Sequence, residues 1–504
     1  MDTYDYIVIG AGAAGCVLAN RLSAAPDTTV LLLEAGGSDD SYARTRFVDL
    51  ESLFSLWEPE TDWGYGTEPS DGLDGRAFPI TQGKVLGGGS STNGRIFIRG
   101  DRRCFDGWAA DGNDGWAYAD VLPYFKKFED YTGGGSAERG AGGPVPIMDL
   151  PSPSPVAQTF VDSAKSLGFN GPVDVNSVPQ DKVVGYCQST TTPELTRAST
   201  AACYVHPALS RPNLAVLTGA LVSRVLFEGT TAVGAEFTVD GRVSRARAAR
   251  EVIVSAGAFN TPKLLMLSGI GPAEHLRACD IDVVADLPGV GENLQDHLLV
   301  RLCHWLESPQ PPLILLSEVN LFAHTRPGSA DAPPDLSILF APFLFPEYGP
   351  LDAGTTLVSS VAQPESRGRV RLGSPDPLVP PVITPNFLAS DVDAETLVAG
   401  LELGRSLLAP LDGLLGKEIV PGPAVRSRAD LLDYVRATAF TEWHPSCTAR
   451  MGVDELAVVD PSLRVRGVER LRVVDSSIMP TMVNSNLHAT VIMIGEKGAD
   501  LILA

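Results

Sequence analysis

The feature that most constrains the fold of this chain is a glycine motif near its N-terminus. Residues 7–9 are an apolar run of the kind that forms a buried strand, and residues 16–22 have the apolar character of a helix. Between them, Gly10, Gly12 and Gly15 stand in G-x-G-x-x-G spacing. The first glycine permits a tight turn, the second lets a pyrophosphate approach the backbone, and the third lets the helix pack on the strand. The pattern predicts a strand–turn–helix unit whose helix N-terminus binds phosphate.

A second strand with an acidic end follows this motif. Residues 29–33 are apolar, and Glu34 comes directly after them. A carboxylate at this distance can accept hydrogen bonds from both ribose hydroxyls of an adenosine. An isolated glycine motif can be an ordinary turn, but strand, glycines, helix, strand and acid in this order favour a dinucleotide site. The residues expected to contact the dinucleotide here are Gly10, Gly12, Ala13, Ala14, Gly15, Glu34 and Ala35.

The composition limits the class of protein. The chain has 504 residues, enough for two or three lobes, and its 44% hydrophobic residues are ordinary for a globular protein. Its net charge of −22 would repel phosphate, so we expect no nucleic-acid partner. No apolar stretch is long enough to suggest a membrane span.

The cysteines indicate a reducing compartment. Seven of them are scattered along the chain without C-x-x-C spacing, and the N-terminus is acidic where a signal peptide would be basic. These features favour reduced thiols in a cytoplasmic protein. We expect no metal ion, and the oligomeric state stays open.

A second glycine-rich segment spans residues 83–94. Its glycine content argues against a regular helix or strand. It predicts a loop whose exposed backbone N–H groups can cradle a phosphate or the polar edge of a ring.

Further strands and a helix are predicted in the middle of the chain. Residues 214–226 and 231–239 are rich in β-branched and apolar side chains and predict antiparallel strands. Residues 251–258 predict a strand that runs into a turn of small residues. A helix should follow over residues 260–268, with Pro262 in its first turn.

The character of the chain changes over residues 299–440. Apolar strands alternate there with proline pairs such as Pro311-Pro312 and Pro380-Pro381, which predicts a separate, sheet-based lobe. The end of the chain returns to the earlier pattern, with a predicted strand over residues 471–475 and a helix over residues 491–503.

Four segments together resemble the glucose–methanol–choline (GMC) family of flavin oxidoreductases. They are the N-terminal motif with Glu34, residues 83–100, residues 257–271 with the nearby 288–297, and the C-terminal pair 443–452 and 475–496. The resemblance extends from residue 5 to residue 503 in the family's order and spacing. Another flavoprotein or nicotinamide enzyme of the Rossmann type is the generic alternative.

The resemblance implies an α/β protein with a Rossmann-type FAD-binding domain and a second, sheet-based (α+β) substrate-binding domain. The FAD-binding domain would comprise residues 1–154, 196–298 and 441–504, and the substrate-binding domain residues 155–195 and 299–440. The implied activity is oxidation of an alcohol to an aldehyde or ketone by hydride transfer to flavin N5. Oxygen or another acceptor would then reoxidise the flavin.

The resemblance also implies contacts with FAD. Asn93 and Gly94 would lie close to the reactive end of the flavin ring, and Val222 would contact the adenine through its backbone. The further contacts implied are Leu86, Gly87, Gly88, Ser90, Asn93, Gly94, Val222, Ala256, Gly257, Asp475, Ala489 and Thr490. Thr92 stands where some members carry a histidine that links covalently to FAD, so we expect bound FAD to be non-covalent.

Two of the seven histidines fall on the family's active-site positions. Expelling hydride from a carbinol carbon requires that the hydroxyl proton be taken or strongly shared, and histidine suits that role near neutral pH. The resemblance implies that His444 is the general base and that His488 hydrogen-bonds and positions the substrate oxygen. A final helix starting soon after His488 would stabilise negative charge on the reduced flavin. The other five histidines are expected to be structural, with His297 near the cofactor.

Two further positions depart from the family pattern. Cys447 stands where glycine is usual, so the turn behind His444 can differ. Its thiol is either reactive or a packed small side chain. Thr490 stands where proline is common, which would loosen the start of the last helix.

Some alternatives stay open. The chain can be an oxidase or a dehydrogenase, because oxygen access depends on local cavity shape. It can also be a lyase, since family members that cleave cyanohydrins keep FAD as a structural element and use a histidine pair. The substrate is expected to be a modest primary or secondary alcohol. Aromatic residues that either line its pocket or fill the core are Trp57, Trp63, Phe340, Phe343, Phe345, Tyr348 and Phe440.

Overall fold

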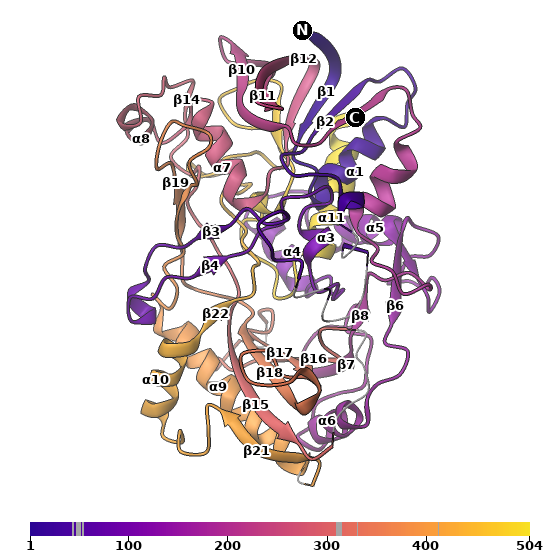
Figure 1. Cartoon of the computed structure of the whole chain (residues 1–504), viewed down its shortest axis with the longest axis vertical. Helices are drawn as coiled ribbons and strands as arrows, with labels where there is room; N and C mark the ends of the chain where they lie inside the picture. Colours follow the sequence, from indigo (N-terminus) through magenta and orange to yellow (C-terminus); the bar gives the residue numbers. More distant parts are fainter. Residues whose placement is uncertain (43–44, 47–51, 53–54, 309–314, 330, 412) are drawn as a thin grey trace.

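Two seven-stranded sheets, one in each half of the molecule, organise the described part of the chain (Figure 1). The structure is a computed structural model that describes residues 1–42, 45–46, 52, 55–308, 315–329, 331–411 and 413–504. The proline pair Pro311-Pro312 lies outside the described residues.

The first sheet is built on parallel strands. Its central strand β1 (Asp2–Ile9) lies between β12 (Arg242–Val254) and β2 (Val30–Leu33), and all three run parallel. Strand β9 (Leu214–Leu217) continues this order beyond β2, and β23 (Leu471–Val473) pairs with β12. The carboxyl ends of these strands therefore meet at one edge.

Two antiparallel strands extend this sheet on the far side of β12. They are β10 (Leu221–Glu228) and β11 (Thr231–Val239). The prediction of antiparallel strands is confirmed for these residues but is wrong for residues 214–217, because β9 pairs in parallel with β2. The chain turns between β9 and β10 at Gly219, whose φ of +68° favours glycine.

Helix α1 (Ala13–Leu22) packs on β1 and β2, and α11 (His488–Leu503) packs on α1. The two helices approach closely at Gly495, where a Cβ would lie 3.0 Å from the nearest α1 side chain. The predicted starts at Cys16 and Val491 are three residues late for both helices. Helix α1 opens with Ala13, Ala14 and Gly15, and α11 opens with His488, Ala489 and Thr490, so apolar periodicity marks neither start.

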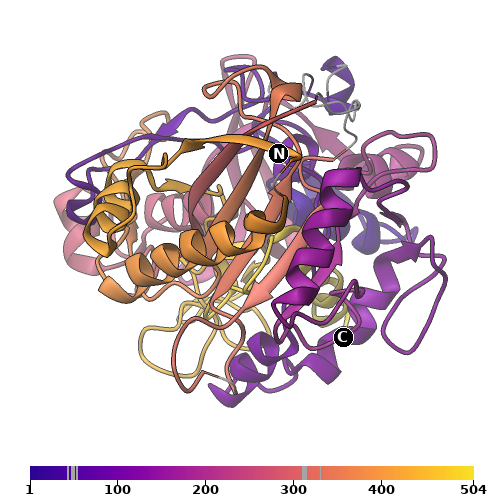
Figure 2. The ribbon, with the colours of Figure 1, turned by 90° about the horizontal axis from the view of Figure 1, so that it is seen from below.

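The second sheet is antiparallel. Its order is β21 (Leu415–Val420), β15 (Leu298–Leu306), β18 (Gly354–Val361), β17 (Leu336–Ala341), β16 (Val319–Ala323) and β7 (Val183–Tyr186), with β22 (Phe440–Thr441) pairing with β15. Helix α9 (Asp391–Leu408), orange in Figure 2, packs across one face. Along β15, Val300 and Leu302 pack into the core on that side, whereas Leu299 and Arg301 line a cavity.

This arrangement confirms the predicted fold class of an α/β Rossmann-type domain with a second, sheet-based domain. Strand β7 comes from the predicted 155–195 segment and joins the second sheet. The exact domain boundaries stay a prediction.

Shorter elements connect the sheets. The other described helices are α3 (Gly89–Thr92), α4 (Arg102–Ala110), α5 (Tyr118–Phe128), α6 (Pro155–Ser166), α7 (Gly257–Leu267), α8 (Ala273–Ala278) and α10 (Arg428–Thr438). The other described strands are β3 (Tyr65–Gly66), β4 (Pro79–Ile80), β5 (Glu129–Tyr131), β6 (Val145–Asp149), β8 (Gln188–Ser189), β13 (Ile270–Gly271), β14 (Ala285–Asp286), β19 (Arg369–Arg371) and β20 (Val382–Thr384).

Two of these helices correct the sequence-based predictions. Helix α3 forms one turn inside the glycine-rich segment, where no helix was expected, because Gly87 and Gly88 turn the chain at positive φ just before it. Helix α7 begins at Gly257, so Pro262 lies in its interior and cannot donate to the Ala258 carbonyl. Instead, Thr448 Oγ1 donates to that carbonyl at 2.6 Å.

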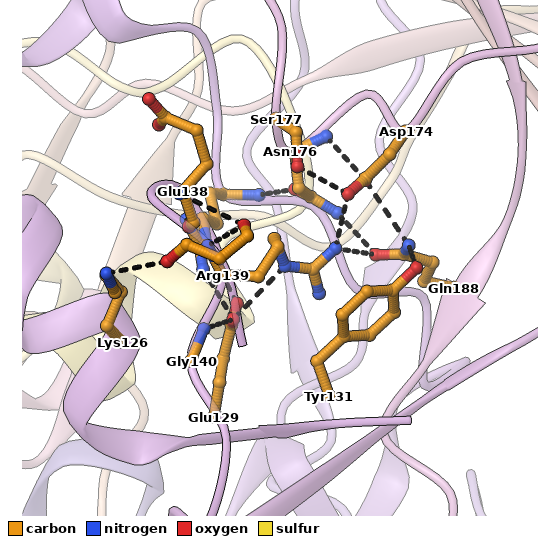
Figure 3. A network of polar contacts seen from close by, with 12 residues as sticks. Lys126, Glu129, Tyr131, Glu138, Arg139, Gly140, Asp174, Asn176, Ser177 and Gln188 are labelled. Atoms are coloured by element: carbon orange, nitrogen blue, oxygen red, sulfur yellow. Dashed lines mark hydrogen bonds and ion pairs between the residues drawn. The ribbon is translucent and has the colours of Figure 1, made fainter. Parts of the chain in front are cut away.

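A buried polar network fastens residues 126–140 to residues 174–188 (Figure 3). At its centre, Arg139 donates to Glu129 at 3.2 Å and to Gln188 at 2.9 Å. Glu129 also pairs with the buried Arg99 at 2.5 Å. The Arg99 carbonyl accepts a hydrogen bond from Thr490 Oγ1 at 3.0 Å. The expectation that Thr490 loosens the start of α11 is therefore wrong: its side chain anchors the first turn.

None of the described helices is long and apolar enough to cross a membrane. All seven cysteines are present as free thiols.

Candidate active site

The carboxyl ends of the parallel strands border a cavity of about 360 Å³. Gly10 follows β1, Glu34 follows β2, and Asp475 comes after β23, and all three line the cavity. Ligands of open α/β sheets bind at this edge. Side chains of the second sheet, including Leu299 and Arg301, also line the cavity, so it lies between the two halves of the molecule.

The three motif glycines have different surroundings. Gly10 has a φ of +96°, and a Cβ there would lie 2.4 Å from the Ser255 carbonyl oxygen. A Cβ on Gly15 would lie 1.9 Å from the Gly10 carbonyl oxygen. A Cβ on Gly12 would meet nothing closer than 4.0 Å, and Gly12 lines the cavity. Two glycines are thus required by packing, and the third leaves room for a ligand beside the backbone.

The Glu34 carboxylate is held by backbone N–H groups. It accepts hydrogen bonds from the N–H groups of Ala11 and Gly36, one on each oxygen, both at 2.8 Å. Burial raises its pKa, and these two hydrogen bonds oppose that change. Each carboxylate oxygen has a second lone pair, so Glu34 can still accept from ribose hydroxyls. The residues at this end of the cavity fit the adenosine and pyrophosphate of FAD.

The glycine-rich segment lies directly against the first motif. The Gly87 N–H donates to the Ala11 carbonyl at 2.7 Å, and a Cβ on Gly88 would lie 2.8 Å from Gly12 Cα. Arg197 holds the end of this segment by donating to the Asn93 carbonyl at 2.6 Å. This contact fixes Asn93 at the wall of the cavity.

Most of the expected site residues line the cavity. These are Gly10, Gly12, Ala13, Ala14, Glu34, Ala35, Gly88, Ser90, Asn93, Gly94, Val222, Ala256, Gly257, His444, Asp475 and His488. Five do not line it: Gly15, Leu86, Gly87, Ala489 and Thr490. They lie behind the wall, where Gly15 and Thr490, for example, make the packing and hydrogen-bond contacts described above.

Asp475 is a structural acceptor as well as a cavity residue. Its carboxylate accepts hydrogen bonds from the Gly257 N–H at 2.9 Å and from the Thr261 hydroxyl at 2.5 Å. Burial raises its pKa, whereas these hydrogen bonds lower it. The contacts join the end of β23 to the start of α7.

His444 lies on the loop after β22 and faces the cavity. Its backbone N–H donates to Asp296 Oδ1 at 2.8 Å. Its Nδ1 is 3.0 Å from Nδ1 of His297 and 3.3 Å from the Glu442 carboxylate. On the other side of the ring, Asn486 Nδ2 lies 3.3 Å from Nε2.

His488 is the first residue of α11 and also lines the cavity. Its Nε2 is buried without a hydrogen-bond partner among the described residues. Burial and the nearby Arg197 lower its pKa to about 4, so the ring is neutral at physiological pH. No side chain caps the start of α11. A neutral imidazole and the positive end of a helix therefore face the same cavity.

Three polar neighbours of His444 were not predicted as site residues. His297 was expected only near the cofactor, and Glu442 and Asn486 were not singled out. Glu442 stands two residues before His444 and Asn486 two residues before His488, a spacing that could have indicated them. The contact between His297 and His444 joins residues 147 positions apart, which local sequence does not reveal.

The aromatic candidates divide between wall and core. Trp57, Trp63 and Phe345 line the cavity, as do Tyr65, Phe259 and Trp443, which were not predicted. Phe340 stacks on Phe160 at 4.6 Å in the core of the second lobe. Phe343, Tyr348 and Phe440 do not line the cavity.

Cys447 keeps the backbone conformation that glycine favours, with a φ of +73°. Burial raises the pKa of its thiol to about 12. These facts agree with a packed small side chain.

Two described clusters have ligand atoms close enough together to hold a metal ion. One is His297, Glu442 and His444, and the other is Asp39, Asp40 and His206. The expectation that the protein binds no metal stays a prediction.

Comparisons with known proteins show which families and structures the chain is similar to. It matches two family models, both described as GMC oxidoreductase, over residues 4–299 and 364–495. The mitochondrial choline dehydrogenase of Mus musculus is 40% identical over 543 residues, covering 99% of this chain and 89% of that protein. Pyridoxine 4-oxidase from Mesorbium loti is 32% identical with a TM-score of 0.89, covering 99% of this chain and 98% of that one. A formate oxidase of Aspergillus oryzae, studied for its FAD modification, is 27% identical with a TM-score of 0.92, covering 99% and 98%.

Proposed function

This chain belongs to the GMC oxidoreductase family, and from that premise we propose that it oxidises an alcohol with His444 as the general base. It is an FAD-dependent oxidoreductase, and the relatives named above give no support to the lyase alternative. The observation that carries the role of His444 is its place: the ring faces the same cavity that the glycine motif and Glu34 border.

The two histidines would divide the work on the substrate hydroxyl. His444 takes the hydroxyl proton. A positioned base of this kind accelerates a reaction by roughly 10²–10⁴-fold. The neutral His488 hydrogen-bonds the substrate oxygen through Nε2, the buried atom that has no partner among the described residues. Bound FAD would accept the hydride from the carbinol carbon.

The cavity walls favour a modest alcohol with apolar or aromatic character. Trp63, Phe345 and Trp443 supply aromatic surface, and Arg301 and Glu442 supply charge at the wall. The named relatives are called a choline dehydrogenase and a pyridoxine oxidase. We infer a primary or secondary alcohol as the substrate and oxygen or another acceptor as the oxidant.

We also propose that FAD binds without a covalent bond. Thr92 occupies the expected linking position and is buried in α3, and its hydroxyl offers no imidazole nitrogen for linkage. Acid precipitation should release all FAD into the supernatant. Flavin retained in the washed pellet would contradict this.

The free thiols support a reducing compartment, and we propose that the protein is cytoplasmic. The acidic net charge of −22 supports the absence of a nucleic-acid partner. The proposed compartment is tested by titrating the thiols of the protein after isolation from its cell and unfolding without a reductant. Seven thiols are expected. Fewer thiols would indicate disulfides and an oxidising compartment.

The deciding experiment for the function is anaerobic flavin reduction with a panel of alcohols. His444→Ala should bind FAD and lose roughly 10²–10⁴-fold in the rate of flavin reduction. His488→Asn should be milder than His488→Ala, because the amide can still hydrogen-bond the substrate oxygen. A His444→Ala variant that reduces its flavin as fast as the parent at saturating alcohol would exclude His444 as the base.

A further inference from the structure

Two titratable side chains, those of His297 and Glu442, meet at Nδ1 of His444, the ring nitrogen opposite the one that Asn486 approaches. Nδ1 of His444 lies 3.0 Å from Nδ1 of His297 and 3.3 Å from the Glu442 carboxylate. His297 is 2% exposed, and the Glu442 side chain is 12% exposed. The hydroxyl of Ser360 donates to the other Glu442 oxygen. The carboxylate is therefore fixed from both sides.

Backbone carbonyls determine the tautomer of His297. Its Nε2 lies 3.2 Å from the Ala362 carbonyl oxygen and 3.1 Å from the Val483 carbonyl oxygen. Carbonyl oxygens only accept hydrogen bonds, so Nε2 must carry the hydrogen. Burial and the neighbouring His444 lower the pKa of His297 to about 4, which keeps the ring neutral near pH 7. Its Nδ1 consequently carries a lone pair and can only accept a hydrogen bond.

The tautomer of His444 follows from that of His297. Because the facing Nδ1 of His297 and the Glu442 carboxylate are both acceptors, Nδ1 of His444 must be the donor. A neutral His444 then has its lone pair on Nε2, the nitrogen approached by the Asn486 amide at 3.3 Å. Nε2 is the atom that can take a proton, so the hydrogen bonds at Nδ1 prepare the base at Nε2.

We propose that Glu442 and His297 are positioning residues that hold His444 as its Nδ1-protonated tautomer and that Glu442 stabilises the ring after Nε2 has been protonated. The proposal rests on the proposed role of His444 as the base. In the step concerned, the substrate hydroxyl gives its proton to Nε2, Nδ1 keeps its own hydrogen, and the new positive charge is paired with the Glu442 carboxylate.

The titratable groups described around His444 come from its own loop, from the segment before β15 and from α11. Glu442 belongs to its own loop, Asp296 and His297 come from the segment before β15, and His488 faces the cavity from α11. Burial raises the pKa of Asp296 to about 6, so this carboxyl is partly protonated below neutrality. Although burial alone would raise the pKa of Glu442, its contact with His444 keeps that pKa below the ordinary value. Glu442 is therefore the reliable negative partner of His444.

The first test is Glu442→Gln, which keeps the shape and removes the charge. The rate constant of anaerobic flavin reduction should be measured from pH 5 to pH 9. The carboxylate pairs with the protonated ring, so its removal should shift the rising limb of the rate profile to lower pH. The plateau should fall about tenfold, because the positive charge that forms on the ring during proton transfer loses its partner. Structural damage alone would lower the rate without moving the limb.

Glu318→Gln is the matched control. Glu318 is a buried glutamate whose carboxylate accepts from the Ser154 hydroxyl at 2.6 Å, as Glu442 accepts from Ser360. It does not line the cavity. Its variant should keep both the plateau and the position of the limb. If the rising limb of Glu442→Gln lay at the same pH as in the parent and in Glu318→Gln, the proposed role of Glu442 would be overturned.

The role of His297 has its own variants and a readout independent of activity. His297→Asn keeps an acceptor near Nδ1 of His444 and should retain more activity than His297→Leu, which removes it. In the ¹⁵N-histidine spectrum of the holoenzyme, the signals that disappear in His444→Ala belong to His444. In the parent at pH 8 these signals should show a protonated Nδ1. Signals of a protonated Nε2 would overturn the assigned tautomer even if His297→Leu does not fold.

The outcomes separate this proposal from the proposed function. If His444→Ala keeps its rate of flavin reduction, the function assigned to His444 fails. If that rate falls but neither Glu442→Gln nor His297→Leu behaves as stated, only the positioning role fails. One equivalent of metal per purified chain that is lost in Glu442→Gln would also overturn the hydrogen-bonded arrangement, because these three side chains can ligate an ion.

Discussion

At the scale of single residues, the loop that carries His444 is under backbone strain. Trp443, directly before it, has a φ of +59°, and Cys447, three residues after it, has a φ of +73°. A non-glycine residue in this region costs about 1–2 kcal/mol. The surroundings hold the strained shape, since the His444 N–H bonds to Asp296 and the Cys447 N–H to the Ser476 carbonyl. Strain of this kind concentrates at functional sites.

The Cys447 thiol should be unreactive in the folded protein. Burial raises its pKa to about 12, so at pH 8 roughly one thiol in 10⁴ is ionised. Cys447→Ser should leave the number of rapidly titrating thiols in native protein unchanged and lower the number in unfolded protein from seven to six. If the native variant had one rapidly reacting thiol fewer than the native parent, the thiol of Cys447 would be reactive.

His488 should make the protein sensitive to acid. Its pKa is lowered from 6.5 to about 4 in the folded state, so below pH 6.5 the unfolded chain binds a proton that the folded chain does not. The stabilisation is fully present above pH 6.5 and is lost as the pH falls toward 4. Between pH 7 and pH 5 the loss is about 2 kcal/mol. With saturating FAD, urea unfolding of His488→Asn should show a smaller decrease over this range by about that amount. Equal decreases in the two proteins would show that His488 titrates normally.

At the scale of elements, sequence patterns located the strands and helices better than their ends. The buried end of β1, residues 7–9, and the whole of β2 are continuous apolar runs, which the sequence displays directly. The start of β1 at Asp2 was not predicted, because its first residues, which include Asp2 and Asp5, are exposed or half-buried. The starts of α7 and α11 were placed three residues late because tertiary contacts determine them. Pro262 is acceptable inside α7 only because Thr448, from a distant loop, satisfies the carbonyl that the proline leaves free.

The hydrogen bond from Thr448 that replaces the missing N–H of Pro262 can be measured by a double-mutant cycle. Thr448→Val should destabilise the protein by about 1–3 kcal/mol, because the buried Ala258 carbonyl loses its hydrogen bond. In a Pro262→Ala background the same change should cost less, since the alanine introduced there supplies the missing backbone N–H. Urea unfolding of the four proteins gives the coupling energy. A coupling indistinguishable from zero would mean that the Thr448 hydroxyl does not replace that bond.

At the scale of the whole molecule, the site is assembled from segments far apart in the chain. The glycine motif with Glu34 was predictable because its chemistry is local. The His444 and His488 positions came from resemblance to a family, since an isolated histidine carries no signal. The contacts of His297 and Glu442 with His444 could not be predicted, because they depend on how the segment before β15 packs against the loop after β22.

Because the FAD site exists only in the folded molecule, FAD should raise stability by mass action. A ligand at 100 times its Kd stabilises by about 2.7 kcal/mol. Gly12→Ala should abolish most of this gain, since its Cβ would occupy space beside the backbone at the cavity wall. The FAD-free form should change by only about 1 kcal/mol or less, because that Cβ meets no protein atom closer than 4.0 Å. Thermal midpoints with and without added FAD measure both effects.

Two other glycines make the comparison decisive. Gly15→Ala should destabilise the FAD-free protein itself, because its Cβ would lie 1.9 Å from the Gly10 carbonyl oxygen. Gly107→Ala, in the middle of α4 with no atom near its added Cβ, should stabilise slightly and leave the FAD-induced shift intact. If Gly12→Ala kept the full shift, the pyrophosphate would not lie against this turn. If instead it lost stability without FAD as Gly15→Ala does, Gly12 would serve packing and not the cofactor.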